Sequence, residues 1–261
     1  ALKRFGAYNA RFRMPSLESG AEHGAAMWYS FNVGPVHFVI VDTETDFPGA
    51  GGDQIAWFRG AGNGGFGDQL TWLEEDLARA QDERDVRPWV IVAGHRPVYA
   101  RESAGSDGRI TYGSSERVRL AFEPLFDKYE VDVYLSGHVH TFERSFPVVD
   151  NNVRFAAGNH DEDSVGAGAG PDFGAASKML YDEPAAPVHI VNGAGGNIEG
   201  MTAPQPMFPG EFPRWHAHAV NMLDGVGILS FTSMSEMRST FVTSDSPTEV
   251  LDELTIRHRR L

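Results

Sequence analysis

The chain has 261 residues, a mass of 28.6 kDa and a formal net charge of −14, a size at which we expect residues 1–261 to form a single domain around one core. The acidic balance argues against nucleic acid or an anionic membrane surface as partner, and no apolar run is long enough for membrane insertion. The absence of cysteine excludes disulfides, thiolate metal sites and cysteine nucleophiles.

Hydrophobic patterning predicts six elements in the first half of the chain. They are strands at 28–32, 36–42, 89–93 and 131–136, a helix that follows Asp68, and a second helix at 116–129. Asp68 has a side chain suited to an N-cap, and the leucines after it share one helix face. Pro124 is expected to kink or restart the second helix. The glycine-rich residues 47–67 are expected to be irregular.

The second half of the chain contains mostly strands. Residues 150–182 are rich in Gly, Ala and Asp and are expected to form a long surface loop. A buried strand at 188–192 runs into a glycine-rich turn at 193–197, and three further strands are predicted near 227–233, 237–243 and 250–257. Helices alternating with strands, followed by strands alone, predict an α/β fold with a sheet sandwich, of α+β type in its last part.

Two predicted loops carry the residues best suited to metal chemistry. His138 and His140 follow a strand and Gly137, and an i, i+2 pair in extended geometry directs both imidazoles to one face. His95 repeats the arrangement of a strand followed by Gly-His. An isolated His-x-His is usually a surface accident, and the strands and glycines give a metal role about equal weight with that alternative. Imidazole suits zinc, iron, copper or nickel.

At these loops the sequence resembles the purple acid phosphatases, which are calcineurin-like metallophosphoesterases. Residues 92–99 and 135–144 are similar to the fourth and fifth metal-binding blocks of that family. Further segments follow in the family's order, at residues 11–15, 28–31, 36–40, 123–129 and 187–191. The resemblance extends from about Tyr8 to Arg257 and is weaker at 47–67 and 150–182.

This resemblance implies a four-layer αββα fold, here lacking its N-terminal part. It also implies two metal ions, iron with iron, zinc or manganese, divided among His95, His138 and His140. In the family the ions clamp phosphate and supply a hydroxide that attacks phosphorus. The resemblance therefore implies a metal-dependent acid phosphatase acting on phosphorylated small molecules or phosphoproteins. The family is mostly extracellular, vacuolar or periplasmic.

The family's first three blocks, which provide two aspartates, a tyrosine and an asparagine, have no counterpart ahead of residues 8–15. An upstream segment or a partner chain would have to complete the site. The alternatives are a catalytically inactive relative within a larger assembly, or a metal-dependent hydrolase of nucleotides, pyrophosphate or phosphodiesters. Residues 158–161 resemble the third block, but their position after the fifth favours coincidence.

Arg96 and Tyr99 are candidates for contact with the phosphate, because a guanidinium beside the metals would counter the acidic surface. The alternative for Arg96 is a pair with a neighbouring carboxylate. Some family members place histidines after this block to protonate the leaving group, and residues 101–115 contain none.

Other polar residues are assigned structural roles. Glu143 and Arg144 are expected to pair and support the His-x-His loop. His37 and His189 are expected to be core histidines with satisfied nitrogens, because they lie within apolar strands. His216 and His218 form a second His-x-His, for which a structural role is also expected. The glycine-rich turn at 193–197 is expected to allow close packing of the chain.

Overall fold

The computed structural model describes residues 6–21, 26–50, 64–101, 104, 109, 113–155, 177–198, 200–201 and 213–258. Within them lie the helices α1 (Gly6–Arg11), α2 (Gln69–Asp82) and α3 (Gly113–Lys128). The strands are β1 (Tyr29–Val33), β2 (Val36–Ile40), β3 (Trp89–Ala93), β4 (Val133–Ser136), β5 (Phe142–Ser145), β6 (Val148–Val149), β7 (Asn152–Val153), β8 (Ser177–Asp182), β9 (Val188–Asn192), β10 (His216–Val220), β11 (Gly225–Phe231), β12 (Glu236–Thr243) and β13 (Val250–Arg257).

The first sheet has the strand order β1-β2-β3-β4-β9-β5-β10. Its four central neighbours β2, β3, β4 and β9 run parallel, whereas β1, β5 and β10 pair antiparallel. Because parallel strands end on the same side, the loops that follow β2, β3, β4 and β9 all emerge at one edge of this sheet.

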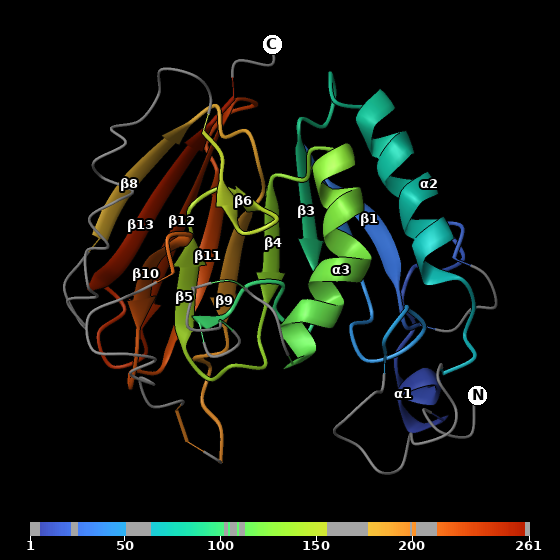
Figure 1. Ribbon diagram of the computed structural model, residues 1–261, viewed down its shortest axis with the longest axis horizontal. Helices are drawn as coiled ribbons and strands as arrows, with labels where there is room; N and C mark the ends of the chain where they lie inside the picture. Colours follow the sequence, from blue (N-terminus) through green and yellow to red (C-terminus); the bar gives the residue numbers. More distant parts are fainter. Residues whose placement is uncertain are drawn as a thin grey trace.

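Side chains alternate between the two faces of the first sheet and so build two cores. On β3, Val90 and Val92 join the core beneath α2 and α3, whereas Trp89 and Ile91 join the core shared with the second sheet. That second sheet has the order β11-β12-β13-β8. Figure 1 shows α2 and α3 on one side of the first sheet and the second sheet on the other.

The described residues therefore form three layers, helix, sheet and sheet, of the expected αββα sandwich. The outer face of the second sheet carries charged pairs, including Lys178 with Glu253 and Arg257 with Glu236. None of the helices within the described ranges has the length and apolar character needed to pass through a membrane.

Most predicted elements are confirmed. Asp68 caps α2, with its carboxylate accepting from the Thr71 amide at 3.1 Å. Residues Gly34 and Pro35 form the tight turn between β1 and β2, and Gly34 has φ +53°. Helix α3 continues through Pro124, so the proline does not restart it.

The expected surface loop at 150–182 is wrong at both ends. Residues 152–153 form β7, and Ser177–Asp182 form β8, an edge strand that pairs parallel with β13. The exposed positions of β8 alternate with less exposed ones, and Lys178 and Leu180 point outward. β8 carries both polar and apolar residues because it lies at the edge of its sheet. The composition of residues 150–182 therefore gave no sign of a strand.

Candidate metal centre

The loops after β3 and β4 lie side by side at the carboxyl edge of the first sheet. The Gly94 amide donates to the Leu135 carbonyl at 3.0 Å, and the Gly137 amide donates to the His95 carbonyl at 3.0 Å. Glycine is required at position 94, where an added Cβ would stand 2.6 Å from the Tyr134 hydroxyl. These contacts hold the two histidine-bearing loops in register.

The structure brings His95 and His138 into direct contact. Nε2 of His95 lies 3.2 Å from Nδ1 of His138, and the ring centroids are 4.9 Å apart. Two imidazole nitrogens bound to one ion with bonds of about 2.0–2.1 Å would be separated by roughly 2.9–3.4 Å. The observed spacing therefore matches that of neighbouring ligands of a single cation.

His140 is held separately from this pair. Its Nδ1 lies 3.0 Å from the Gly200 carbonyl oxygen, and its Nε2 lies 2.7 Å from Nδ2 of Asn197. Because a carbonyl only accepts, Nδ1 carries the proton, and the Nε2 lone pair accepts from the Asn197 amide. Metal-binding histidines are oriented in this way, with one N–H donated to a carbonyl.

The residue between the two histidines explains why both rings face outward. Val139 is buried and packs against Ala100 and Val191. His138 adopts φ +67°, in the left-handed region that non-glycine residues rarely occupy and that is found at functional sites. Gly137, which precedes it, has open space where a Cβ would be and no positive φ. The sharp backbone conformation is therefore at His138.

The glycine turn after β9 packs tightly against this loop. An added Cβ on Gly193 would lie 1.9 Å from the Val139 carbonyl oxygen. The Gly193 amide donates to the Thr141 carbonyl at 3.0 Å. The close-packing function expected for residues 193–197 is therefore confirmed at Gly193.

Arg96 is held between a carboxylate and a histidine. Its Nε donates to Oε1 of Glu44 at 2.7 Å, which confirms the expected carboxylate partner. Its Nη1 lies 2.9 Å from Nε2 of His138, so the guanidinium also reaches the histidine pair. The backbone is fixed as well, because the Tyr134 hydroxyl donates to the Arg96 carbonyl at 2.7 Å. Contact of Arg96 with phosphate stays a prediction.

Tyr99 is not brought to the histidines. Its ring is buried, its hydroxyl donates to Glu123 at 2.5 Å, and it accepts from the Asn151 amide at 2.9 Å. Burial, followed by the neighbouring Glu123 carboxylate, raises the pKa of Tyr99 well above its usual value. The segment after His95 turns into the core, which directs this side chain away from the edge.

Burial lowers the pKa of His95 and lowers the pKa of His138 to about 4. The cationic neighbour Arg96 adds to the shift for both rings. Both imidazoles are consequently neutral at pH 7, the protonation state in which an imidazole can serve as a metal ligand.

Residues after β2 supply oxygen atoms that the sequence reading missed. Oε1 of Glu44 lies 3.9 Å from Nε2 of His95. Asp42 is buried, accepts from the Thr45 hydroxyl at 2.9 Å, and has its pKa raised by burial. The sequence signal for these oxygen atoms is the acidic stretch directly after a buried parallel strand. The histidine loops also follow such strands.

Two structural assignments from the sequence need correction. Glu143 and Arg144 do not pair with each other, because successive strand residues point to opposite faces. Arg144 instead forms a buried bidentate pair with Asp252 at 2.8 Å. His189 is buried as expected, but both its ring nitrogens lack a hydrogen-bond partner among the described residues, unlike those of His37.

The second His-x-His lies inside β10, where His216 and His218 are buried. They are separated from the loop edge by the strand itself. Residues 158–161 lie outside the described ranges. Imidazoles fit the metals expected for such a centre, but within the described residues no three His, Asp or Glu side chains surround a common point. The described residues alone therefore do not form a complete metal site.

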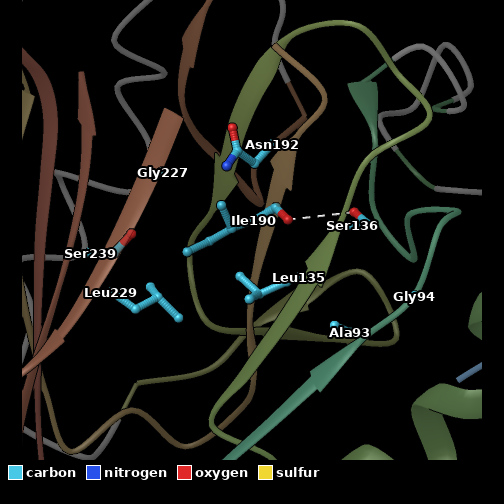
Figure 2. A pocket seen from close by; sticks show the side chains of 9 residues that line it. All are labelled: Ala93, Gly94, Leu135, Ser136, Ile190, Asn192, Gly227, Leu229 and Ser239. Atoms are coloured by element: carbon cyan, nitrogen blue, oxygen red, sulfur yellow. Dashed lines mark hydrogen bonds between the residues drawn. The ribbon is translucent and has the colours of Figure 1, made fainter. Parts of the chain in front are cut away.

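A cavity of about 260 Å³ lies behind the histidine loops, between the two sheets. Figure 2 shows Leu135 and Ile190 of the first sheet facing Leu229 of the second across it. Gly94 and Ser136, the neighbours of the two histidine loops, also line the cavity. An open pocket between the two sheets thus borders both histidine loops.

Residues 19–142 match the sequence model of the calcineurin-like phosphoesterases, and residues 186–253 match that of the iron/zinc purple acid phosphatase-like protein C. An acid phosphatase A of Cryphonectria parasitica is 36% identical over 75% of this chain and 33% of its own length. The human acid phosphatase type 7 is 33% identical over 78% of this chain and 40% of its own length. This chain therefore spans between a third and two fifths of these relatives.

The fold is similar to that of a solved purple acid phosphatase from yellow lupin seeds. The superposition has a TM-score of 0.62 and 22% identity, and it covers 96% of this chain and 35% of the lupin chain. This likeness supports the layered arrangement of sheets and helices.

Proposed function

We propose that this chain, as a member of the purple acid phosphatase group of the calcineurin-like phosphoesterases, supplies the histidine side of a two-metal phosphomonoesterase centre. The observation that carries the proposal is the 3.2 Å approach of His95 Nε2 to His138 Nδ1. Both nitrogens belong to neutral rings at the edge where parallel strands end, the usual place for ligands in α/β folds.

The geometry supports a division of the three histidines. His95 and His138 would hold one ion, because their nitrogens have the spacing of neighbouring ligands. His140 would hold the second ion through Nε2, whose orientation the Gly200 carbonyl fixes. Iron with iron, zinc or manganese is the metal pair implied by the family. When bound, such ions supply charge neutralisation and an activated hydroxide.

Arg96 would change partners when the site is filled. Its guanidinium donates to Nε2 of His138, so the proton of the neutral ring lies on Nδ1, facing His95. With a cation held by Nδ1, the proton of the neutral ring would lie on Nε2, and Arg96 would lose its acceptor. The guanidinium, still anchored to Glu44, would then be available for a phosphate oxygen.

The rest of the centre would come from polypeptide outside this chain, either an upstream segment or a partner chain. That residues 1–261 form one domain, and that the protein is extracellular or periplasmic, stay predictions. The absence of a three-donor cluster within the described ranges supports one alternative, a relative that binds without catalysing. Nucleotides, pyrophosphate or phosphodiesters are the alternative substrates for an active centre.

The test is phosphate release from para-nitrophenyl phosphate by the protein as its gene encodes it, with iron and zinc supplied. His138→Ala is expected to lower turnover by at least roughly 100-fold, because metal ions contribute several kcal/mol to such transition states. His189→Phe is the matched control, since this histidine is buried away from the edge. Equal turnover in wild type and His138→Ala would reject the proposal.

A wild type inactive on all phosphate esters that still binds the metals would favour the binding relative. Faster turnover of ATP, pyrophosphate or bis(para-nitrophenyl) phosphate would instead identify the substrate class.

A further inference from the structure

A buried polar network lies directly beneath the His138–His140 loop, and none of its members is a ligand candidate. Oδ1 of Asn221 accepts from Nη2 of Arg101 at 3.0 Å and lies 3.0 Å from the Thr141 hydroxyl. The Arg101 amide donates to Glu143 at 2.9 Å. All four side chains are buried. Three separate parts of the chain meet in this network: the segment after β3, the start of β5 and the end of β10.

We propose that Asn221 is a positioning residue that fixes the His138–His140 loop, an inference that rests on the proposed metal function. Asn221 follows β10, and Thr141 directly follows His140. The single carbonyl oxygen of Asn221 therefore connects the loop to Arg101, the end of the segment that begins at His95. Through it, the two histidine-bearing segments share one anchor.

The contacts in this network fix the positions of its residues and do not form a close ion pair. Arg101 and Glu143 are both charged and buried, yet their closest side-chain approach is 3.8 Å, longer than a hydrogen bond. Elsewhere the buried guanidiniums of Arg84 and Arg144 contact their carboxylates at 2.7 and 2.8 Å. Near the loop, backbone and amide hydrogen bonds replace the direct pair and fix the course of the chain.

Asn221 also has a polar group with no structural use. Its Nδ2 is buried without a hydrogen-bond partner among the described residues. An unsatisfied buried donor costs stability and calls for an explanation. We explain this unsatisfied nitrogen by the oxygen of the same amide, which contacts both Arg101 and Thr141. A residue that served packing alone would be apolar at this position.

Apolar contacts complete the platform. Val139 packs with Ala100, the neighbour of Arg101, and with Val191 of β9. Loss of the Asn221 oxygen would leave the Thr141 hydroxyl with its remaining carbonyl acceptors, chiefly Val220 at 3.0 Å, and would remove the hydrogen bond that Nη2 of Arg101 donates to Asn221. The expected result is a loosened loop in a chain that still folds.

The test compares Asn221→Leu with Asn221→Asp, which keeps the accepting oxygen, and with Tyr181→Phe. The last variant removes a buried hydrogen bond to Arg144 between the sheets. Amide hydrogen exchange at Val139, Thr141 and Gly193 of the metal-free chain is the first measurement. Exchange should be at least tenfold faster in Asn221→Leu and unchanged in the other two.

The zinc affinity of the protein as its gene encodes it, measured by calorimetry at pH 7, is the second measurement. Asn221→Leu should bind zinc roughly 10–100-fold more weakly, as found for residues that orient ligands. Unchanged loop exchange in Asn221→Leu, or equal acceleration in Asn221→Asp, overturns the positioning function. If the wild-type protein, as its gene encodes it, binds no zinc, accelerated exchange in Asn221→Leu supports the positioning and rejects the metal centre, so the two failures are distinguishable.

Discussion

The histidines at the carboxyl edge of the first sheet differ from those inside its strands in what surrounds their rings. His95 is exposed and His138 is half-buried; the two rings touch each other and contact Glu44 or Arg96. His189 and His216 are buried among aromatic rings, including Tyr99 and Trp215. The position of an imidazole relative to a strand end, more than its residue type, therefore decides whether it can take part in chemistry.

The largest expected effect on stability is in the strand interior. Arg144→Met leaves Asp252 buried without its partner and should reduce the free energy of unfolding by about 3–5 kcal/mol. Urea denaturation measures the loss. Replacing Asp252 by Leu in the same chain should recover most of it, and a double variant as unstable as the single one would contradict the buried-pair account.

A methyl group added beneath the loop edge should have the next largest effect. Gly193→Ala places a Cβ 1.9 Å from the Val139 carbonyl, and overpacking of this kind costs about 3 kcal/mol. Gly137→Ala is the matched control, because no atom lies within 4 Å of its added Cβ. Denaturation midpoints that shift equally for both variants would show that the close packing is not needed.

Acid should weaken the fold through the interior histidines. Burial lowers the pKa of His189 and of His216 to about 3, so both are neutral in the folded protein while their unfolded counterparts protonate below about pH 6.5. The unfolded state then binds more protons, and stability falls with pH from about 6.5 towards 3. Each histidine should account for about 2 kcal/mol between pH 6.5 and pH 5.

Chemical denaturation at pH 7 and pH 5 measures this difference. His189→Phe, whose ring fits between Tyr99 and Tyr134, should remove about half of the acid effect attributed to the two histidines. An unchanged difference between the two pH values would mean that His189 titrates normally in the folded protein.

The smallest effect on stability is expected at the edge. His95→Ala should change the free energy of unfolding by no more than about 0.5 kcal/mol, because the side chain is largely exposed and lies outside the cores. The same change should abolish tight zinc binding. A large loss of stability in the metal-free variant would place His95 with the interior histidines and break the comparison.

Local pattern was enough to predict the edge loops but not all of the interior. His138 and His140 followed a recognisable apolar strand and a glycine, which made their placement at a strand end predictable. His216 and His218 share the same spacing, yet β10 is short and pairs only with β5 within the described residues, so its strand character depends on tertiary contacts.

Side-chain direction was the main feature that the sequence could not determine. Tyr99 is four residues from His95, but the intervening chain turns inward and buries it against Glu123. Arg144 is four residues from His140 and crosses to Asp252 in the second sheet. Both outcomes depend on which distant strand or helix is opposite, information that short motifs do not contain.

Crystals of the protein as its gene encodes it, soaked in zinc and measured at the zinc absorption edge, would test the central claim most directly. The account predicts an anomalous peak bound by Nε2 of His95 and Nδ1 of His138, at about 2.0–2.1 Å from each nitrogen. A zinc peak elsewhere on the protein, with these two rings turned apart, would contradict it.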